Sequence, residues 1–370
     1  MHTFWTFTLI TTHCLLLAGS LPAAKCPCSD PSLCKTVTAK PKKETFVFRT
    51  AGSTWKNYDW SKITTVGVFG EYDPQLMCTA HAHGVRLVQA GAFPVLNLTD
   101  ETQRDKWITE QVQLVEDRFM DGFNIDIEDS LFDSYRQELL TTFVNQTTQV
   151  FHSKIPGSQV TFDVAWTPDC ARQGFRCYDY RGLADVTDFL FVMDYDEMGS
   201  IADPCVADAN SPYNKTVTAM ESFIDLGIPL SKLLMGLPWY GYDYPCLNLT
   251  RNKCVVKHLP FWPVCDENVG TKKNYAVIMK LLANNSTSGR IWSDVNKSPY
   301  FNYKDSTTEQ FHQIWYDDPQ SLKLKFDYAT KRGLLGVGLW QADALDYSDD
   351  PTAKAQTKAM WDALPTRKNN

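Results

Sequence analysis

The distribution of apolar and polar residues predicts eight strands separated by helical segments. Short runs rich in Val, Ile, Phe and Leu are bounded by turn residues, which is typical of buried strands. Between them, apolar residues recur at helical spacing, as in the stripe formed by Ile108, Val112 and Val115. Eight such units predict an α/β fold, a (β/α)8 TIM barrel. The strands are expected at residues 45–48, 63–70, 86–93, 121–128, 159–166, 189–196, 233–241 and 333–341.

The segment between the last two predicted strands is too long for a simple loop. Residues 242–310 contain three cysteines, several glycosylation sequons and short apolar runs, and we expect them to form a small inserted α+β lobe. Residues 25–43 are rich in Cys, Pro and Lys and are expected to form an N-terminal arm tied by disulfides. The barrel would then comprise residues 44–365.

The first 24 residues carry no Lys, Arg, Asp or Glu and include an apolar run around Leu15, Leu16 and Leu17. Small residues follow, so residues 1–24 are predicted to be a secretory signal peptide. No later run is long and apolar enough to span a membrane, and we expect no membrane partner. The chain has 36 basic and 43 acidic residues, a net charge of −7, without basic runs. This balance argues against a nucleic acid partner.

Ten of the 11 cysteines follow the signal segment, an even number that predicts up to five disulfides. Cys170 and Cys177 bracket a short loop and form the best local pair. Cys26-Pro27-Cys28 leaves open a metal or redox site, which the lack of a second matching Cys pair disfavours. Many sequons also indicate a secreted or lysosomal glycoprotein. They lie at Asn97, Asn145, Asn214, Asn248, Asn284, Asn285 and Asn296.

One predicted strand, residues 121–128, carries a column of polar side chains. Asn124, Asp126 and Glu128 share one face of the strand, and apolar residues occupy the other. Burying such a column is costly unless the groups pair or take part in chemistry. Residues two apart lie about 6.6–6.8 Å from each other along a strand, so Asp126 and Glu128 could flank a scissile bond. A structural hydrogen-bond column remains the alternative.

The segment Asp121-Gly122-Phe123-Asn124-Ile125-Asp126-Ile127-Glu128 resembles the DGxDxDxE signature of family 18 glycoside hydrolases, the chitinase family. Asn124 departs from that signature, since most members carry a second Asp there. Three further segments are similar to family motifs: residues 193–196 to MxYD, 237–241 to GxPxYG, and 336–340 to the ending of the eighth strand. Residues 89–92 depart from the SxGG of relatives.

The resemblance implies a retaining, substrate-assisted glycoside hydrolase that needs no metal or other cofactor. Glu128 would act as general acid and then as general base. Asp126 would hold the N–H of the substrate's 2-acetamido group, and the Tyr195 hydroxyl would hold its oxygen in line for attack. The resemblance also implies that further residues contact the sugar. These substrate-binding residues are Asp196, Trp340, Asn124, Tyr240 and Trp239.

The Asn-containing signature, short loops, N-terminal cysteines and length are most similar to lysosomal members of the family. That similarity implies cleavage of the β1,4 bond in the GlcNAc–GlcNAc (chitobiose) core of Asn-linked oligosaccharides, from the reducing end, during glycoprotein degradation. We expect a monomer that acts on this oligosaccharide in the lysosome, with secretion as the alternative. A general chitinase and a catalytically inactive chitinase-like lectin are the alternative functions, although Glu128 is retained.

Several other residues receive structural interpretations. His81 is expected to cap a helix or to face solvent rather than to bind a metal. Asp194 has the opposite parity to Tyr195 and is expected to be a cap or a surface residue. Asp121 shares the parity of the isoleucines and is expected to support the site from behind. The aromatic residues between the first two strands could line a sugar subsite or simply pack.

Overall fold

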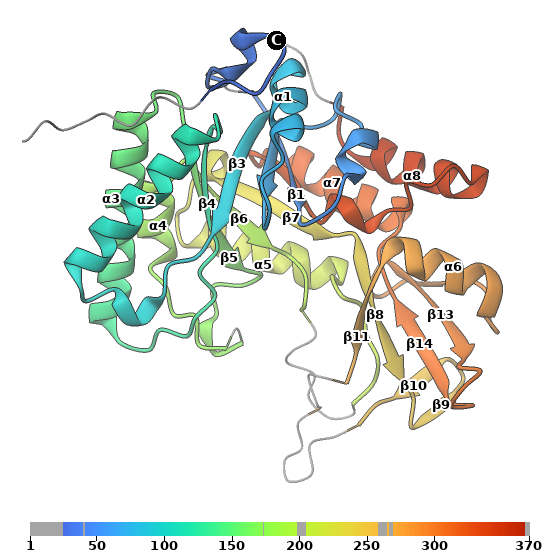
Figure 1. Ribbon diagram of the computed structural model, residues 1–370. Coiled ribbons are helices and arrows are strands. Elements are labelled where there is room, and N and C mark those ends of the chain that lie inside the picture. Colours follow the sequence, from blue (N-terminus) through green and yellow to red (C-terminus); the bar gives the residue numbers. More distant parts are fainter. Residues whose placement is uncertain are drawn as a thin grey trace, which may run out of the picture.

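The computed structural model describes residues 25–39, 41–172, 174–197, 205–257, 265 and 269–366. Eight parallel strands form a closed barrel in the order β1-β15-β7-β6-β5-β4-β3-β2 (Figure 1). The predicted TIM barrel is therefore confirmed. The barrel strands are β1 (Glu44–Arg49), β2 (Thr65–Val68), β3 (Arg86–Gly91), β4 (Gly122–Ile125), β5 (Gln159–Ala165), β6 (Phe189–Met193), β7 (Leu233–Pro238) and β15 (Gly336–Trp340).

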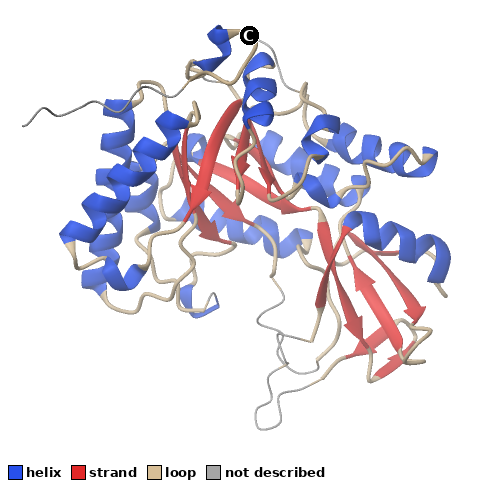
Figure 2. Ribbon diagram, in the orientation of Figure 1, coloured by secondary structure: helices blue, strands red, loops and turns tan. Residues whose placement is uncertain are grey.

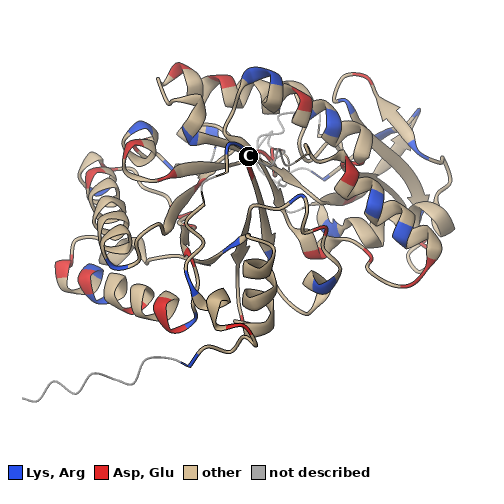
Figure 3. Ribbon diagram, turned by 90° about the horizontal axis from the view of Figure 1, so that it is seen from above, with Lys and Arg blue, Asp and Glu red and all other residues tan. Residues whose placement is uncertain are grey.

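Helices cover the outside of the barrel (Figure 2), and acidic and basic residues are mixed along them (Figure 3). They are α1 (Pro74–Ala82), α2 (Glu101–Asp117), α3 (Ser134–Lys154), α4 (Tyr180–Val186), α5 (Tyr213–Asp225), α7 (Pro319–Arg332) and α8 (Pro351–Ala363). Short 3₁₀ helices lie at Pro31–Cys34, Thr54–Asn57, Val95–Asn97, Cys170–Arg172, Leu230–Lys232 and Ala342–Ala344. None of the described helices combines the length and apolar character that crossing a membrane requires.

The first turn and the buried stripe of α2 follow from its sequence. Asp100 accepts a hydrogen bond from the backbone N–H of Gln103, which satisfies one of the free donors of the first turn. Ile108, Val112 and Val115 are buried against the barrel, as their spacing predicts.

Aromatic side chains fill the inside of the barrel. The ring of Phe191 packs against those of Phe46 and Phe48, with centroids 5.6 and 4.9 Å apart. Glycines on β7 and β15 leave space for the Phe191 ring. A Cβ atom at Gly236 or Gly338 would lie 2.1 or 2.2 Å from the Phe191 ring, so a side chain at either position would displace it.

A lobe lies between β7 and β15, beyond the C-terminal ends of the barrel strands (Figure 1). Its main sheet is antiparallel in the order β11-β8-β14-β13-β12, and it packs with one helix. Strand β8 begins one residue after β7, so the sheet starts before residue 242 and extends past residue 310. The lobe elements are β8 (Tyr240–Pro245), β9 (Asn248–Thr250), β10 (Lys253–Val255), β11 (Thr271–Asn274), α6 (Tyr275–Asn285), β12 (Ile291–Ser293), β13 (Ser298–Lys304) and β14 (Phe311–Trp315).

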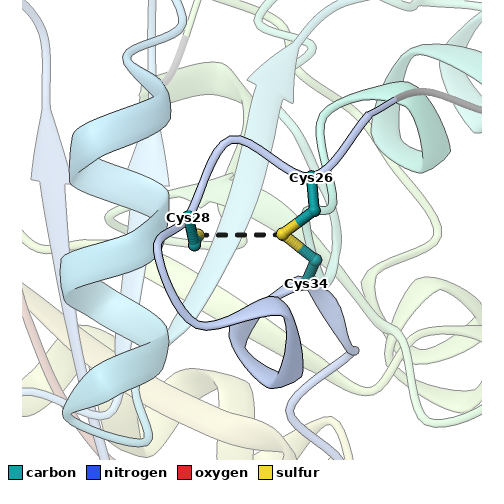
Figure 4. Close-up of side chains that lie close together, drawn as sticks. All are labelled: Cys26, Cys28 and Cys34. Carbon is teal, nitrogen blue, oxygen red and sulfur yellow. Dashed lines mark hydrogen bonds between the residues drawn. A yellow bond between two sulfur atoms is a disulfide. The ribbon is translucent and has the colours of Figure 1, made fainter.

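Five disulfides join the ten cysteines of the described residues. Cys170–Cys177 is the expected local pair. In the N-terminal arm, the sulfur atoms of Cys26, Cys28 and Cys34 lie close together (Figure 4), but all three are oxidised, so they are not the thiolates that a metal site requires. The expected signal peptide lies outside the described residues. The pairs are Cys26–Cys34, Cys28–Cys78, Cys170–Cys177, Cys205–Cys265 and Cys246–Cys254.

A buried ion pair holds the arm against the barrel. In α1, Nε2 of His81 lies 2.8 Å from the Asp121 carboxylate, and Nδ1 lies 2.6 Å from the Leu33 carbonyl oxygen. Asp121 also accepts hydrogen bonds of 2.7 Å from the backbone N–H groups of Val37 and Leu87. The expectation that His81 caps a helix or faces solvent is therefore wrong, because the arm covers its ring.

Both ring nitrogens of His81 face groups that only accept hydrogen bonds, which suits the doubly protonated imidazolium. Burial, the largest single effect, lowers the pKa of His81, while the hydrogen bond and charge of Asp121 and the Leu33 carbonyl raise it. The net result is a pKa above the ordinary 6.5. Because the folded protein binds this proton more tightly, the contact stabilises the fold at acid pH.

We expect His81→Gln to lower the free energy of unfolding by about 1–3 kcal/mol at acid pH, because Asp121 loses a charged partner. The difference from wild type is fully present below pH 6.5 and is lost as the pH rises through the raised pKa of folded His81. Thermal unfolding followed at about pH 5 and about pH 8.5 measures both limits. A difference that grew toward alkaline pH would contradict this assignment.

Candidate active site

The polar column that follows β4 continues the pairing of that strand. Register pairs Asn124 of β4 with Thr161 of β5, and the backbone N–H of Asp126 bonds to the Gly91 carbonyl of β3. Asp126 and Glu128 therefore leave the barrel at the C-terminal ends of its strands, where barrel enzymes place their reactive groups. This end also faces the inserted lobe (Figure 1).

Asn124 is fully buried, and its side chain donates a hydrogen bond to a neighbouring carboxyl group rather than to solvent. Its Nδ2 donates hydrogen bonds of 2.8 Å to the Thr161 hydroxyl and to the Asp163 carboxyl. Although Asn124 shares a strand face with Asp126, its amide nitrogen bonds to Asp163 on the neighbouring strand. The side-chain oxygen of Asn124 and one carboxyl oxygen of Asp126 are buried without a protein partner, so this part of the site can take a ligand group or water.

Burial raises the pKa values of two carboxyl groups here, those of Asp126 and Asp163. Desolvation and then the charge of Glu128 raise the pKa of Asp126 to about 7, against the opposing charge of Arg176. Desolvation, followed by the charge of Asp126, raises the pKa of Asp163 well above its usual range. Two carboxyls that remain partly protonated beside a third are typical of acid–base sites.

Glu128 is only half-buried, with 48% of its side chain exposed, and it forms an ion pair of 2.6 Å with Arg176. Arg176 lies in the disulfide-closed loop Cys170–Cys177, which follows β5. The last two acidic residues of the predicted signature therefore differ in environment. Asp126 is partly buried near Asp163, whereas Glu128 lies on the solvent-facing side of the site next to a guanidinium.

Tyr195 follows β6, which is separated from β4 only by β5, and it lies close enough to Asp126 and Asp163 to feel their charges. Desolvation, followed by the charges of Asp163 and Asp126, raises the pKa of its hydroxyl well above the usual range. The hydroxyl therefore stays protonated and can donate a hydrogen bond. The Tyr195 ring packs edge-on against Tyr240 of β8, with centroids 6.0 Å apart.

Asp196 connects β6 to the lobe. Its carboxylate accepts hydrogen bonds from the hydroxyl groups of Tyr240 and Tyr242, the latter at 2.8 Å, and pairs with Lys272 of β11 at 2.7 Å. The backbone of Asp196 is left-handed, with φ of 57°, which turns the chain toward the lobe. The lobe therefore supplies part of the wall beside Tyr195.

The two tryptophans expected to bind substrate lie in different environments. Trp340, at the end of β15, is partly exposed and packs against Phe48 and Phe69, with ring centroids 5.2 and 5.3 Å away. Trp239 is fully buried and packs edge-on against Trp361 of α8. The expectation that Trp239 binds substrate is therefore wrong. Adjacent residues of a strand point in opposite directions, so Trp239 enters the core while the following tyrosine faces the site.

The aromatic residues between β1 and β2 belong to the packing around the barrel. Trp55, Tyr58 and Trp60 are all buried, and the Tyr58 hydroxyl donates a hydrogen bond of 2.5 Å to Asp343. The alternative that these rings line a subsite receives no support, because little of their surface reaches solvent.

A second buried acidic group lies behind Tyr195. Asp194 is fully buried, and the expectation that it is a cap or surface residue is wrong, because the chain bends after Met193 and the strand parity ends there. Desolvation, followed by the charge of Glu197, raises the pKa of Asp194 well above its usual range. Desolvation also raises the pKa of Glu197 to about 8. A buried Lys325–Asp317 pair of 2.7 Å, whose charges act on Glu197, completes the group.

Asp163 and Arg176 are site residues that the sequence reading missed. Asp163 had a visible signal, because it interrupts an apolar strand and shares a face with Thr161, as in the column of β4. No sequence signal pointed to Arg176, because its contact with Glu128 depends on how two loops pack together. Tyr178 holds these loops together by donating hydrogen bonds of 3.1 and 2.6 Å to the carbonyl oxygens of Ile127 and Asp129.

A parallel barrel that gathers carboxyl groups at the C-terminal end of β4, a tyrosine after β6 and a tryptophan at the end of the last strand has the arrangement of a carbohydrate-cleaving barrel enzyme. The chain belongs to the glycosyl hydrolases family 18, whose family model matches residues 90–344. It is accordingly a glycosidase.

Curated relatives cover nearly the whole chain. It is 49% identical to di-N-acetylchitobiase of Mus musculus over 98% of both chains. It is 47% identical to di-N-acetylchitobiase of Homo sapiens, over 92% of this chain and 88% of that one. Among solved structures, class V chitinase from Nicotiana tobaccum is similar with a TM-score of 0.67 at 19% identity, covering 86% of this chain and 99% of that one, which supports the fold.

The charges around Asp126 predict opposite effects of two substitutions. Glu128→Gln removes a negative charge and should move the pKa of Asp126 below about 7, whereas Arg176→Gln removes a positive charge and should move it higher. Carbon NMR of labelled aspartate carboxyls, followed through a pH titration, measures both. Shifts in the same direction for the two variants would contradict this electrostatic arrangement.

Proposed function

We propose that this chain is a retaining, substrate-assisted glycosidase that splits the β1,4 bond of the GlcNAc–GlcNAc core of Asn-linked oligosaccharides from the reducing end. The observation that carries the proposal is the arrangement of Asp126 and Asp163, whose pKa values desolvation raises, beside the half-exposed Glu128. The mammalian relatives named di-N-acetylchitobiase, at 47–49% identity, support the substrate.

The reaction divides between the substrate and three side chains. The oxygen of the substrate's 2-acetamido group attacks the anomeric carbon, and Glu128 gives its proton to the departing glycosidic oxygen. Asp126 accepts a hydrogen bond from the acetamido N–H as positive charge develops. The Tyr195 hydroxyl donates to the acetamido oxygen and keeps it in line. Glu128 then removes a proton from the water that opens the oxazolinium ring, and the anomeric configuration is retained.

The fully buried Asn124 acts from behind this group. Its donation to Asp163 lowers the pKa of that carboxyl, against the larger effect of burial. In this protein an amide therefore occupies a position where most family members carry a carboxyl, and it supplies a donor without adding a titratable proton.

We also infer passage through the secretory pathway to the lysosome, where acid pH favours both the protonated carboxyl column and the His81–Asp121 contact. Five disulfides among the described residues support an oxidising compartment during folding. Exposed sequon asparagines at Asn214, Asn248 and Asn285 can accept glycans. Residues 1–24 would be removed as a signal peptide.

The substrate is tested with chitobiose-core oligosaccharides that carry either a free reducing end or a peptide-linked one. Wild type should cleave the free form and leave the linked form intact. Glu128→Gln should lose about 10²–10⁴-fold in kcat, because it removes the general acid. Hydrolysis of both forms would favour a general chitinase, and tight binding without turnover would favour a lectin. Equal hydrolysis of analogues without the N-acetyl group would contradict substrate assistance.

Asn124→Asp should shift the pH dependence of kcat/KM toward alkaline pH by about one pH unit, because a further buried acid raises the pKa of its neighbours. Thr161→Val is the matched control, since it changes the same column without adding charge. A profile that Asn124→Asp leaves in place would show that the amide does not set the titration of the column.

A further inference from the structure

Two exposed phenylalanine rings lie in contact on the loops that carry Glu128 and Arg176. Phe132 is 69% exposed and Phe175 is 49% exposed, and their ring centroids are 5.0 Å apart with an interplanar angle of 37°. Single exposed apolar residues are common, but a pair of touching aromatic rings outside the core is less so. Neither ring belongs to the buried clusters of the barrel.

Backbone contacts connect this aromatic pair to the acid. Leu131, next to Phe132, forms a β-bridge with Arg176, and its N–H donates a hydrogen bond of 3.0 Å to the Phe175 carbonyl oxygen. The side chain of Arg176 in turn holds Glu128. The rings and the acid are therefore carried by the same two joined loops, one after β4 and one after β5, at the end of the barrel that bears the site.

The local backbone fixes the Phe175 ring outward. Phe175 has a φ of 61° directly after Gly174 with a φ of 58°, although left-handed backbone is unfavourable for an aromatic residue. The Cys170–Cys177 disulfide closes this loop, and the Ser130 hydroxyl donates to the Gly174 carbonyl oxygen. The structure holds an unfavourable conformation that exposes an apolar ring, which is typical of a binding position rather than of packing.

We propose that Phe132 and Phe175 form the floor of a subsite for the sugar that departs, the reducing-end GlcNAc, with Arg176 donating hydrogen bonds to it. This inference rests on the proposed function. A general acid lies on the leaving-group side of the bond that it protonates, so the loops that carry Glu128 meet the departing sugar. A pyranose presents an apolar C–H face that packs on aromatic rings, and its hydroxyl groups accept hydrogen bonds from a guanidinium.

The test compares two substrates that share the sugar at the anomeric centre and differ in what departs. Di-N-acetylchitobiose releases GlcNAc, whereas N-acetylglucosaminyl β-fluoride releases only fluoride when the acetamido oxygen attacks. The test variant combines Phe132→Ser with Phe175→Asn, since Asn tolerates left-handed backbone. Phe311→Ser is the matched control, because Phe311 is a 43% exposed ring on β14 of the lobe. Phe132→Trp tests rescue by another aromatic ring.

We expect the double variant to lose about ten-fold in kcat/KM on di-N-acetylchitobiose and to bind added GlcNAc about ten-fold more weakly as a product inhibitor. Its turnover of the fluoride should match wild type, and Phe311→Ser should keep wild-type values on both substrates. Phe132→Trp, which retains an aromatic ring, should lose less on di-N-acetylchitobiose than the double variant does. An equal loss on both substrates, or no loss on either, would overturn the subsite. So would dissociation of a wild-type oligomer by the double variant, because the rings would then be an interface. Wild type that turned over neither substrate would instead contradict the proposed function.

Discussion

The structure depends on burying a polar column between β4 and β5 next to the apolar side chains that pack the barrel. Asn124, Thr161 and Asp163 satisfy part of that column with hydrogen bonds of 2.8 Å. The remainder is balanced by protonation, since desolvation raises the pKa values of Asp126 and Asp163. A barrel filled with phenylalanine rings therefore does more than stabilise the fold. Its low polarity makes carboxylic acids hold protons at a pH where they are ordinarily ionised.

Two other parts of the molecule meet this column from opposite sides. The disulfide-closed loop after β5 brings the guanidinium of Arg176 to Glu128, and the lobe brings Lys272 to Asp196. The charge of Arg176 opposes the rise in the pKa of the nearby Asp126, but desolvation has the larger effect on that carboxyl. Asp126 and Glu128, which follow β4, thus lie in different environments, as acid–base pairs in barrel enzymes require.

Periodicity was sufficient for the architecture, because each barrel strand is an apolar run with clear turn signals. It also placed Asp126, Glu128 and Tyr195 at one end of the barrel. Parity failed where β6 ends, so Asp194 lies buried. The wrong expectation for Trp239 came instead from the family resemblance, and this residue lies in the core. Periodicity could not predict the contacts of Asp163 and Arg176. These contacts depend on strand register and on how two loops pack, and a single sequence does not specify which segments become neighbours.

The N-terminal arm is made early, but it is attached only after later parts of the chain exist. Cys28 must wait for Cys78, which is 50 residues further along the chain, and the N–H of Val37 must wait for Asp121, which is 84 residues further. During synthesis the arm therefore trails free until α1 and the fourth strand exist. Its attachment requires the chain as far as Asp121, and it occurs at the end of the barrel remote from the chemistry. Oxidation thus acts at both ends of the barrel: Cys28–Cys78 fixes the arm, and Cys170–Cys177 closes the loop that holds Arg176 next to Glu128.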